Sequence, residues 1–224
     1  MTTFLWWLLP LMSIWIIGLL TAKANWGGPH VNWLDGWTRI LCRGLHRLGK
    51  QQIALPESGA AIVVANHVSG VDPLLLIAAS KRPLRFLIAR EEYQRFGLRW
   101  LFKAAGCIPV DRDGRPEKSL RQALKALQQG EVIALFPHGK IHLDSDPPRK
   151  LKAGFARLAA WTESPVIPVR IDGVGAPGNV ITAPFIPSHV QLTVAQPIQV
   201  NTASLDECLS HVQQVIENTD NARH

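Results

Sequence analysis

The chain has 224 residues, of which 47% are hydrophobic and 18% are charged, and its formal net charge is +7 at pH 7. This length is enough for one domain with a substantial core. Three cysteines without a C-x-x-C pattern exclude a disulfide-rich secreted scaffold and indicate free thiols in a reducing compartment. Residues 81–125 hold twelve Lys or Arg and five acids, which predicts an anionic partner. We expect the phosphates of a lipid or of a carrier group, and no nucleic acid.

Residues 2–22 carry no charged side chain and form the first predicted element. A helix of that length is about 31 Å long, close to the thickness of the hydrocarbon core of a bilayer. We therefore predict a transmembrane or deeply embedded anchoring helix, with Pro10 as a point where it can kink. A cleaved signal peptide is the alternative, because residues 22–24 resemble a cleavage site. It is disfavoured, because no basic residue precedes the apolar run and three tryptophans lie within it.

A second helix is predicted over residues 33–48, where apolar side chains recur at helical spacing. Arg39, Arg43 and Arg47 form a basic stripe at i, i+4 and i+8, as in a helix that lies among lipid headgroups. The alternative is a helix packed on the domain with a solvated basic face. We assign residues 1–50 to a membrane-embedded or interfacial segment and residues 51–224 to a separate domain. Because basic residues follow the apolar run, the domain should lie on the cytoplasmic side of the cell membrane.

Short apolar segments alternate with helical patterns after residue 50, which predicts an α/β fold with a mixed sheet flanked by helices. The predicted strands cover residues 60–65, 84–89, 107–110, 132–136, 166–171 and 190–195. The predicted helices cover residues 73–80, 91–105, 116–129, 150–161 and 204–218. Residues 173–189 are rich in Gly and Pro and should form a loop.

The end of the first of these strands carries the most informative residues. His67 is a base that works near neutral pH, and a carboxylate beside it would fix its tautomer and stabilise its charged form. Five residues on a helix correspond to about 140° of rotation, so His67 and Asp72 can meet only across a turn. Asp72 would then be the N-cap of a helix that begins at Pro73. The alternative is that Asp72 is only a cap and His67 only a polar loop residue.

Other patterns in the chain give weaker predictions. The G-x-G-x-x-G sequence over residues 173–178 is followed by prolines that leave no room for a phosphate-binding helix. His138 and His142 have the spacing of metal ligands, but the sequence offers no further ligand cluster. A G-x-S-x-G elbow is absent from the sequence, which disfavours an α/β-hydrolase. Cys107 lies in an apolar strand and is expected to be a buried structural thiol.

Four segments in chain order resemble the sequence blocks of the 1-acyl-sn-glycerol-3-phosphate acyltransferases, a family of glycerolipid and lysophospholipid acyltransferases. Residues 66–72 (NHVSGVD) resemble the N-H-x-S-x-x-D block, and residues 89–112 resemble a second block that ends on a phosphate-binding arginine. Residues 136–139 (FPHG) are similar to the F-P-E-G block. Residues 166–169 (VIPV) are similar to a fourth, proline-centred block.

The resemblance implies that residues 51–224 form an acyltransferase domain. This enzyme would transfer a fatty acyl group from an acyl thioester to the free hydroxyl of a lysophospholipid during phospholipid biosynthesis. The donor would be acyl-carrier protein or acyl-CoA, the acceptor 1-acylglycerol-3-phosphate, and the lipid partners those of the membrane. His67 would be the general base, assisted by Asp72, and Arg112 would bind the acceptor phosphate. The other implied substrate-binding residues are Asn66, Ser69, Pro137, His138, Gly139 and Lys140. The resemblance implies no metal ion and no organic cofactor.

The third block departs from the family pattern. His138 stands where the family has Glu, and Lys140-Ile141-His142 stands where Thr-Arg-Ser is usual. The acidic residue and the arginine of the family pattern are thus both replaced. An alternative acceptor is therefore a different lyso-lipid, such as a remodelling substrate or an amino-acid-based lipid. Two further alternatives remain open, a paralogue that binds lipid without turnover and a thioesterase with water as the acceptor.

Overall fold

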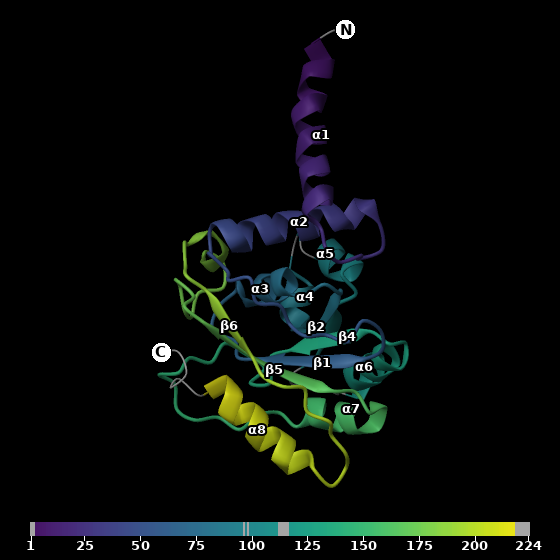
Figure 1. Cartoon of the computed structure of the whole chain (residues 1–224), viewed down its shortest axis with the longest axis vertical. Coiled ribbons are helices and arrows are strands. Elements are labelled where there is room, and N and C mark those ends of the chain that lie inside the picture. The colour runs from purple at the N-terminus through teal and green to yellow at the C-terminus, as the bar shows by residue number, and fades with distance from the viewer. Residues whose placement is uncertain (1–2, 96, 98, 112–116, 218–224) are drawn as a thin grey trace.

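The structure, a computed structural model, describes residues 3–95, 97, 99–111 and 117–217. Its centre is a six-stranded sheet in the order β3-β2-β4-β1-β5-β6 (Figure 1). Neighbouring strands are parallel except β5 and β6, which are antiparallel, so the sheet is mixed as predicted. The strands are β1 Ala61–Ala65, β2 Leu84–Ala89, β3 Ile108–Val110, β4 Val132–Leu135, β5 Val166–Asp172 and β6 Gln191–Val194.

Helices cover both faces of this sheet, and β1 lies between them. Ala61, Val63 and Ala65 pack toward α2 and α3, whereas Ile62 and Val64 pack toward α6, α7 and α8. Because both of its faces are covered, β1 is a continuous apolar run with every residue 0% exposed. The helices are α1 Thr3–Thr21, α2 Pro29–Gly44, α3 Asp72–Ala79, α4 Arg90–Tyr93, α5 Arg99–Ala104, α6 Glu117–Gln128, α7 Gly154–Thr162 and α8 Leu205–Glu217.

The predicted elements differ from the observed ones mainly where a turn interrupts a helical pattern. The helix predicted over residues 91–105 is two short helices, α4 and α5. Gly97, between them, has a φ of +81°, which a continuing α-helix does not allow. The helix predicted from residue 33 begins at Pro29, a favourable first helical residue, and ends at Gly44. The Gly- and Pro-rich loop contains one 3₁₀ turn, Ala183–Phe185.

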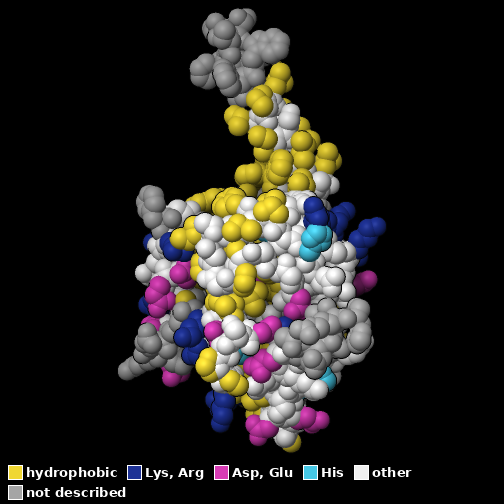
Figure 2. Space-filling view, turned by 90° about the vertical axis from the view of Figure 1, so that its left-hand side faces the viewer, with side chains coloured by type: hydrophobic (Ala, Val, Ile, Leu, Met, Phe, Trp, Pro, Cys, Tyr) yellow, Lys and Arg dark blue, Asp and Glu magenta, His cyan; other side chains and the backbone are white. Residues whose placement is uncertain are grey.

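The C-terminal end of α1 packs against α2, and the rest of α1 projects away from the domain (Figure 1). Glycines allow the close contact, because a Cβ at Gly36 would lie 1.8 Å from the backbone oxygen of Gly18. Apolar side chains of α1 remain exposed, including Leu11 (62%) and Leu20 (77%). Figure 2 shows that the surface of this helix is largely apolar. Within the described ranges, no helix has both the length and the apolar character needed to cross a membrane.

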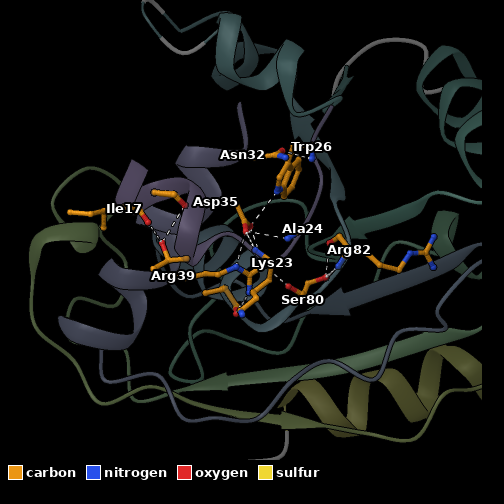
Figure 3. Close-up of polar contacts among 12 residues, drawn as sticks. Ile17, Lys23, Ala24, Trp26, Asn32, Asp35, Arg39, Ser80 and Arg82 are labelled. Atoms are coloured by element: carbon orange, nitrogen blue, oxygen red, sulfur yellow. Dashed lines mark hydrogen bonds and ion pairs between the residues drawn. The ribbon is translucent and has the colours of Figure 1, made fainter. Parts of the chain in front are cut away.

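A buried ion pair between Asp35 and Arg39 joins α1, α2 and α3 (Figure 3). The two carboxylate oxygens of Asp35 accept bonds from Arg39 Nε at 2.8 Å and Nη2 at 3.0 Å. The same carboxylate accepts the backbone N–H of Lys23 at 2.8 Å, in the turn between α1 and α2. Arg39 also donates to the backbone oxygens of Ala78 and Ser80 at the end of α3.

This ion pair corrects the prediction of a continuous basic stripe on the second helix. Arg39 is 3% exposed and is part of the packing, whereas Arg43, one turn later, is exposed. The alternative of a helix packed on the domain therefore describes the Arg39 side of α2. The helix also contributes Cys42 to the core on this side of the sheet.

We predict that Arg39→Ala lowers the free energy of unfolding by about 3–5 kcal/mol, because the carboxylate of Asp35 is then buried without a cation. Urea denaturation of the purified full-length chain measures this difference. Arg43→Ala is the matched control, and its effect should stay within about 0.5 kcal/mol, as for other surface changes. Equal effects of the two substitutions would contradict the assignment of Arg39 as a structural cation.

Candidate active site

The predicted contact between His67 and Asp72 is present at the carboxyl edge of the parallel strands. Residues 66–71 leave the end of β1 and turn back, so that the first residue of α3 faces the imidazole. His67 Nδ1 lies 2.8 Å from Asp72 Oδ2. The His67 side chain is 20% exposed and that of Asp72 is 0% exposed. A buried carboxylate is thus paired with a histidine that solvent can reach.

Every hydrogen bond of the Asp72 carboxylate goes to the loop that precedes it. Oδ2 accepts the backbone N–H groups of Val68 at 2.7 Å and Ser69 at 2.8 Å, and Oδ1 accepts the Ser69 hydroxyl at 2.9 Å. The prediction that Asp72 is the N-cap of the following helix is therefore wrong. Val71 occupies the N-cap position, and no side chain caps this helix. The carboxylate instead bonds the backbone of the loop and the imidazole of His67.

The imidazole of His67 is held on two sides. Its ring stacks on that of Phe136, the residue after β4, with centroids 4.1 Å apart and planes inclined by 15°. Because Nδ1 is bonded to Asp72, the tautomer that donates from Nδ1 leaves the lone pair on Nε2. Nε2 is therefore the nitrogen available to take a proton from a substrate.

The contacts of Asn66 and Ser69 support positioning roles. The Asn66 carboxamide bonds both the oxygen (2.9 Å) and the N–H (2.7 Å) of Ile171 on β5, and the residue is 4% exposed. Ser69 is 0% exposed, and its hydroxyl bonds Asp72. The family resemblance implies that both bind substrate. In the structure Asn66 holds the His67 loop against β5, and Ser69 bonds Asp72 within the loop.

The third block forms a tight turn after β4. Gly139 has a φ of +75°, and its N–H donates to the oxygen of Phe136 at 3.0 Å. Pro137 is buried, and its oxygen accepts the N–H of Lys152 at 3.1 Å. Lys140 and Lys152 are both exposed. The ammonium of Lys152 lies close to Gly139, because a Cβ at that glycine would be 2.9 Å from it.

His138 is placed differently from the other residues of this block. It is 2% exposed, and Nε2 lies 3.3 Å from Glu217 Oε1 on α8. Burial lowers the pKa of His138, and the nearby His142 lowers it further. The side chain is thus directed into the packing between the turn and α8, which does not support the prediction that it binds substrate.

The predicted phosphate ligand Arg112 lies outside the described residues. Its neighbour Asp111 is described and forms an ion pair of 3.7 Å with Arg90. Among the described residues, the exposed cationic side chains near the third block are Lys140, Arg149, Lys150 and Lys152.

Arg170 is a residue that the sequence analysis missed. It lies on β5, is 3% exposed, and donates from Nε to Asp172 at 2.9 Å and from Nη2 to Asp144 at 2.7 Å. Its Nη1 donates to the backbone oxygen of Ile216 on α8. An arginine inside an apolar strand with an aspartate two residues later, on the same face, was the signal available in the sequence.

The Gly- and Pro-rich loop packs against the His67 loop. The N–H of Gly178 donates to the oxygen of Val68 at 2.7 Å, and the N–H of Gly70 donates to the oxygen of Asn179 at 2.9 Å. A Cβ at Gly70 would lie 1.9 Å from the oxygen of Val180. Only glycine lets the two loops approach this closely.

Cys107 has the environment of a structural thiol. It is buried, and desolvation raises its pKa to about 11. At neutral pH the nucleophilic thiolate is therefore almost absent. The three cysteines of the chain are all free and buried.

The comparisons with known proteins agree with this arrangement. The model of the family described as Acyltransferase matches residues 47–172, more than half of the chain, and the chain belongs to this family. Its relatives include 1-acyl-sn-glycerol-3-phosphate acyltransferases, the family that the four sequence blocks resemble.

Two relatives and one solved structure illustrate the likeness. An N-acylphosphatidylethanolamine synthase of Arabidopsis thaliana is 30% identical over 178 residues, 67% of this chain and 62% of that protein. A probable 1-acyl-sn-glycerol-3-phosphate acyltransferase of Mycoplasma pneumoniae is 35% identical over 121 residues, 51% of this chain and 45% of that protein. The chain thus spans less than two thirds of either relative.

The structural comparison supports the fold. The 1-acyl-sn-glycerophosphate (LPA) acyltransferase PlsC of Thermotoga maritima has a TM-score of 0.66 and is 24% identical. The match covers 84% of this chain and 78% of that one.

We predict that Gly70→Ala lowers the free energy of unfolding by about 1–3 kcal/mol, the range for an overpacked site. The added methyl would force the His67 loop away from the backbone of Val180. Thermal unfolding measures the change, and Gly49→Ala is the control because nothing lies within 4 Å of a Cβ there. A Gly70→Ala protein as stable as the Gly49→Ala protein would show that the loops can separate without loss.

Proposed function

We propose that the protein transfers a fatty acyl group from an acyl thioester to the free hydroxyl of a lysophospholipid, with 1-acylglycerol-3-phosphate as the acceptor. The donor is acyl-carrier protein or acyl-CoA. The observation that carries the proposal is the 2.8 Å contact between His67 Nδ1 and Asp72 Oδ2. It orients a partly exposed imidazole at a strand end and leaves Nε2 for the substrate. Membership of the acyltransferase family supports the same reaction class.

In the proposed reaction, His67 Nε2 takes the proton of the acceptor hydroxyl while the hydroxyl oxygen bonds to the carbonyl carbon of the thioester. The carbon–sulfur bond then breaks, and the imidazolium returns the proton to the departing thiolate. Asp72 stabilises the imidazolium through the Nδ1 hydrogen bond. The ring of Phe136 limits the rotation of the imidazole. None of these steps requires a metal ion or an organic cofactor.

The acceptor phosphate is proposed to bind cations near the third block. Arg112 is the arginine that the family resemblance implies for this role. Lys140 and Lys152 are exposed at the turn after β4. They would supply positive charge from new positions, because Ile141 stands where the family pattern has an arginine. A phosphomonoester would be attracted by these ammonium groups, with a strength that falls as salt increases.

N-acylation of an aminophospholipid is the second candidate. It is supported by the alignment over 178 residues with a protein named N-acylphosphatidylethanolamine synthase, and by the replacement of the acidic residue in the third block. The same base would take a proton from an amine that attacks the thioester.

We also propose that α1 anchors the protein in the cell membrane, with the catalytic domain on the cytoplasmic side. The exposed apolar side chains of α1 support this, because an apolar surface of this extent needs a partner (Figure 2). Arg43 and Arg47, which are exposed, would add attraction to anionic lipid. The site would then lie close to lipid substrates and within reach of cytosolic acyl donors.

The direct test is to incubate purified protein with radiolabelled acyl donors and three acceptors: 1-acylglycerol-3-phosphate, another lysophospholipid and phosphatidylethanolamine. We expect an alkali-labile ester product with the first acceptor. His67→Ala should lower the rate by about 10²–10⁴, the contribution of a general base. Asp72→Asn, which keeps an oxygen for the backbone donors but removes the charge, should also be severely impaired. His211→Ala, an exposed histidine on α8, is the control and should retain the wild-type rate.

The other outcomes of this assay separate the alternatives. An alkali-stable amide from phosphatidylethanolamine alone would replace the proposed reaction with N-acylation. Free fatty acid formed without an acceptor would indicate a thioesterase, and no product with any acceptor would indicate a lipid-binding paralogue. More than a third of the wild-type rate in His67→Ala would reject His67 as the general base.

We predict that replacing Leu11 and Leu20 together with Glu releases much of the protein from membranes. Two charges on the exposed surface of α1 would oppose burial in lipid. The measurement is the fraction that pellets with membranes after carbonate or high-salt extraction, in which the wild-type protein should resist release. Trp161→Glu is the control, because this tryptophan is 59% exposed but lies on α7, on the other side of the sheet (Figure 1). Equal release of both variants would contradict the assignment of α1 as the anchor.

A further inference from the structure

Three side chains that can bind a metal ion meet beside the third block. His138 and His142 come from the turn after β4, and Glu217 comes from the end of α8. One ligand atom from each lies within 4.8 Å of the other two. The rings of His138 and His142 stack with centroids 4.3 Å apart. The sequence spacing indicates the two histidines, with Asp144 and Asp146 nearby, and the fold supplies Glu217 as the third ligand.

One ring nitrogen of this cluster is buried without a hydrogen bond to the described residues. His138 is 2% exposed, and its Nδ1 has no hydrogen-bond partner among the residues that the structure describes. A buried polar atom without a partner costs about 1–3 kcal/mol. An imidazole nitrogen with a free lone pair is the atom that binds a metal ion.

The positions of the ligands are fixed by the surrounding packing. Arg170 donates to the backbone oxygen of Ile216, the residue before Glu217, and to the carboxylate of Asp144, two residues after His142. A single buried guanidinium thus holds both sides of the cluster. The Glu217 side chain is 32% exposed, which gives an ion a route from solvent.

We propose that His138, His142 and Glu217 bind a Zn²⁺ ion or a similar transition-metal ion, with water completing its coordination. Two imidazoles and one carboxylate form a common zinc ligand set, with ligand distances of about 2.0–2.2 Å. Binding would draw the three groups together and would join the turn after β4 to α8. Ca²⁺ and Mg²⁺ are disfavoured, because they prefer ligand sets made of oxygen alone.

The ion would act on the His67 loop through the backbone. The N–H of His142 donates to the backbone oxygen of His67 at 2.8 Å. An ion that fixes His142 therefore also fixes the segment that bonds His67. Its role is structural, since it takes no part in the proposed acyl transfer, and the inference does not depend on that activity.

The test is to treat the purified full-length chain with a chelator and titrate it with ZnCl₂ by calorimetry, and to measure thermal unfolding with and without the metal. We expect one equivalent of Zn²⁺ to bind and to raise the unfolding temperature. Glu217→Gln and His142→Ala should each weaken binding at least about tenfold, as changes at metal sites do. His211→Ala removes an exposed histidine from the same helix as Glu217 and should bind Zn²⁺ like the wild type.

Circular dichroism of the metal-free proteins checks that each variant is folded before titration. No binding to the folded wild-type protein would overturn the proposal. Wild-type affinity in both Glu217→Gln and His142→Ala would also overturn it, as would an equal loss in His211→Ala, because the zinc would then bind elsewhere.

Discussion

A carboxylate removed from water must be compensated by hydrogen bonds, and for Asp72 this requirement shapes the whole site. Its two oxygens accept two backbone N–H groups, one hydroxyl and one imidazole N–H. Satisfying all four donors forces residues 67–71 to turn back on themselves at the end of β1. The loop geometry, the orientation of His67 and the start of α3 are thus consequences of one desolvated charge.

The surroundings of His67 come from three parts of the chain that the parallel strands bring to one edge. Phe136, the residue after β4, supplies an aromatic ring, and β5 supplies the backbone that Asn66 binds. Residues 173–189 lie against Val68 and Gly70. The imidazole therefore has little freedom before any substrate arrives. Preorganisation of this kind lets a base act without first being ordered.

The sequence was most informative where interactions are local. The apolar run of β1 indicated a strand covered on both faces, and the spacing of His67 and Asp72 required a turn between them. The burial of Arg39 was less visible, because its basic neighbours suggested a solvated stripe. Asp35, four residues earlier, was the sign of an ion pair within the helix. The strand order could not be predicted, since it depends on pairings between distant segments.

A contact between residues far apart in the sequence also explains why Glu217 could not be predicted to lie beside the third block. Glu217 lies 79 residues after His138, and no periodicity relates the two positions. The substitution of His for Glu in the third block looked like a change in substrate binding. In the fold this histidine is buried between the turn after β4 and α8, where it contacts Glu217.

Helix α3 has a further consequence for the molecule. It begins at Asp72, which holds His67, and its last carbonyl groups are held by Arg39 of α2. Eight residues, about 12 Å of helix, thus set the spacing between the α1–α2 pair and the imidazole. Inserting one residue into α3 would turn one end by about 100° relative to the other. The length of this helix is therefore under tighter constraint than its apolar composition, which tolerates exchange among side chains of similar volume.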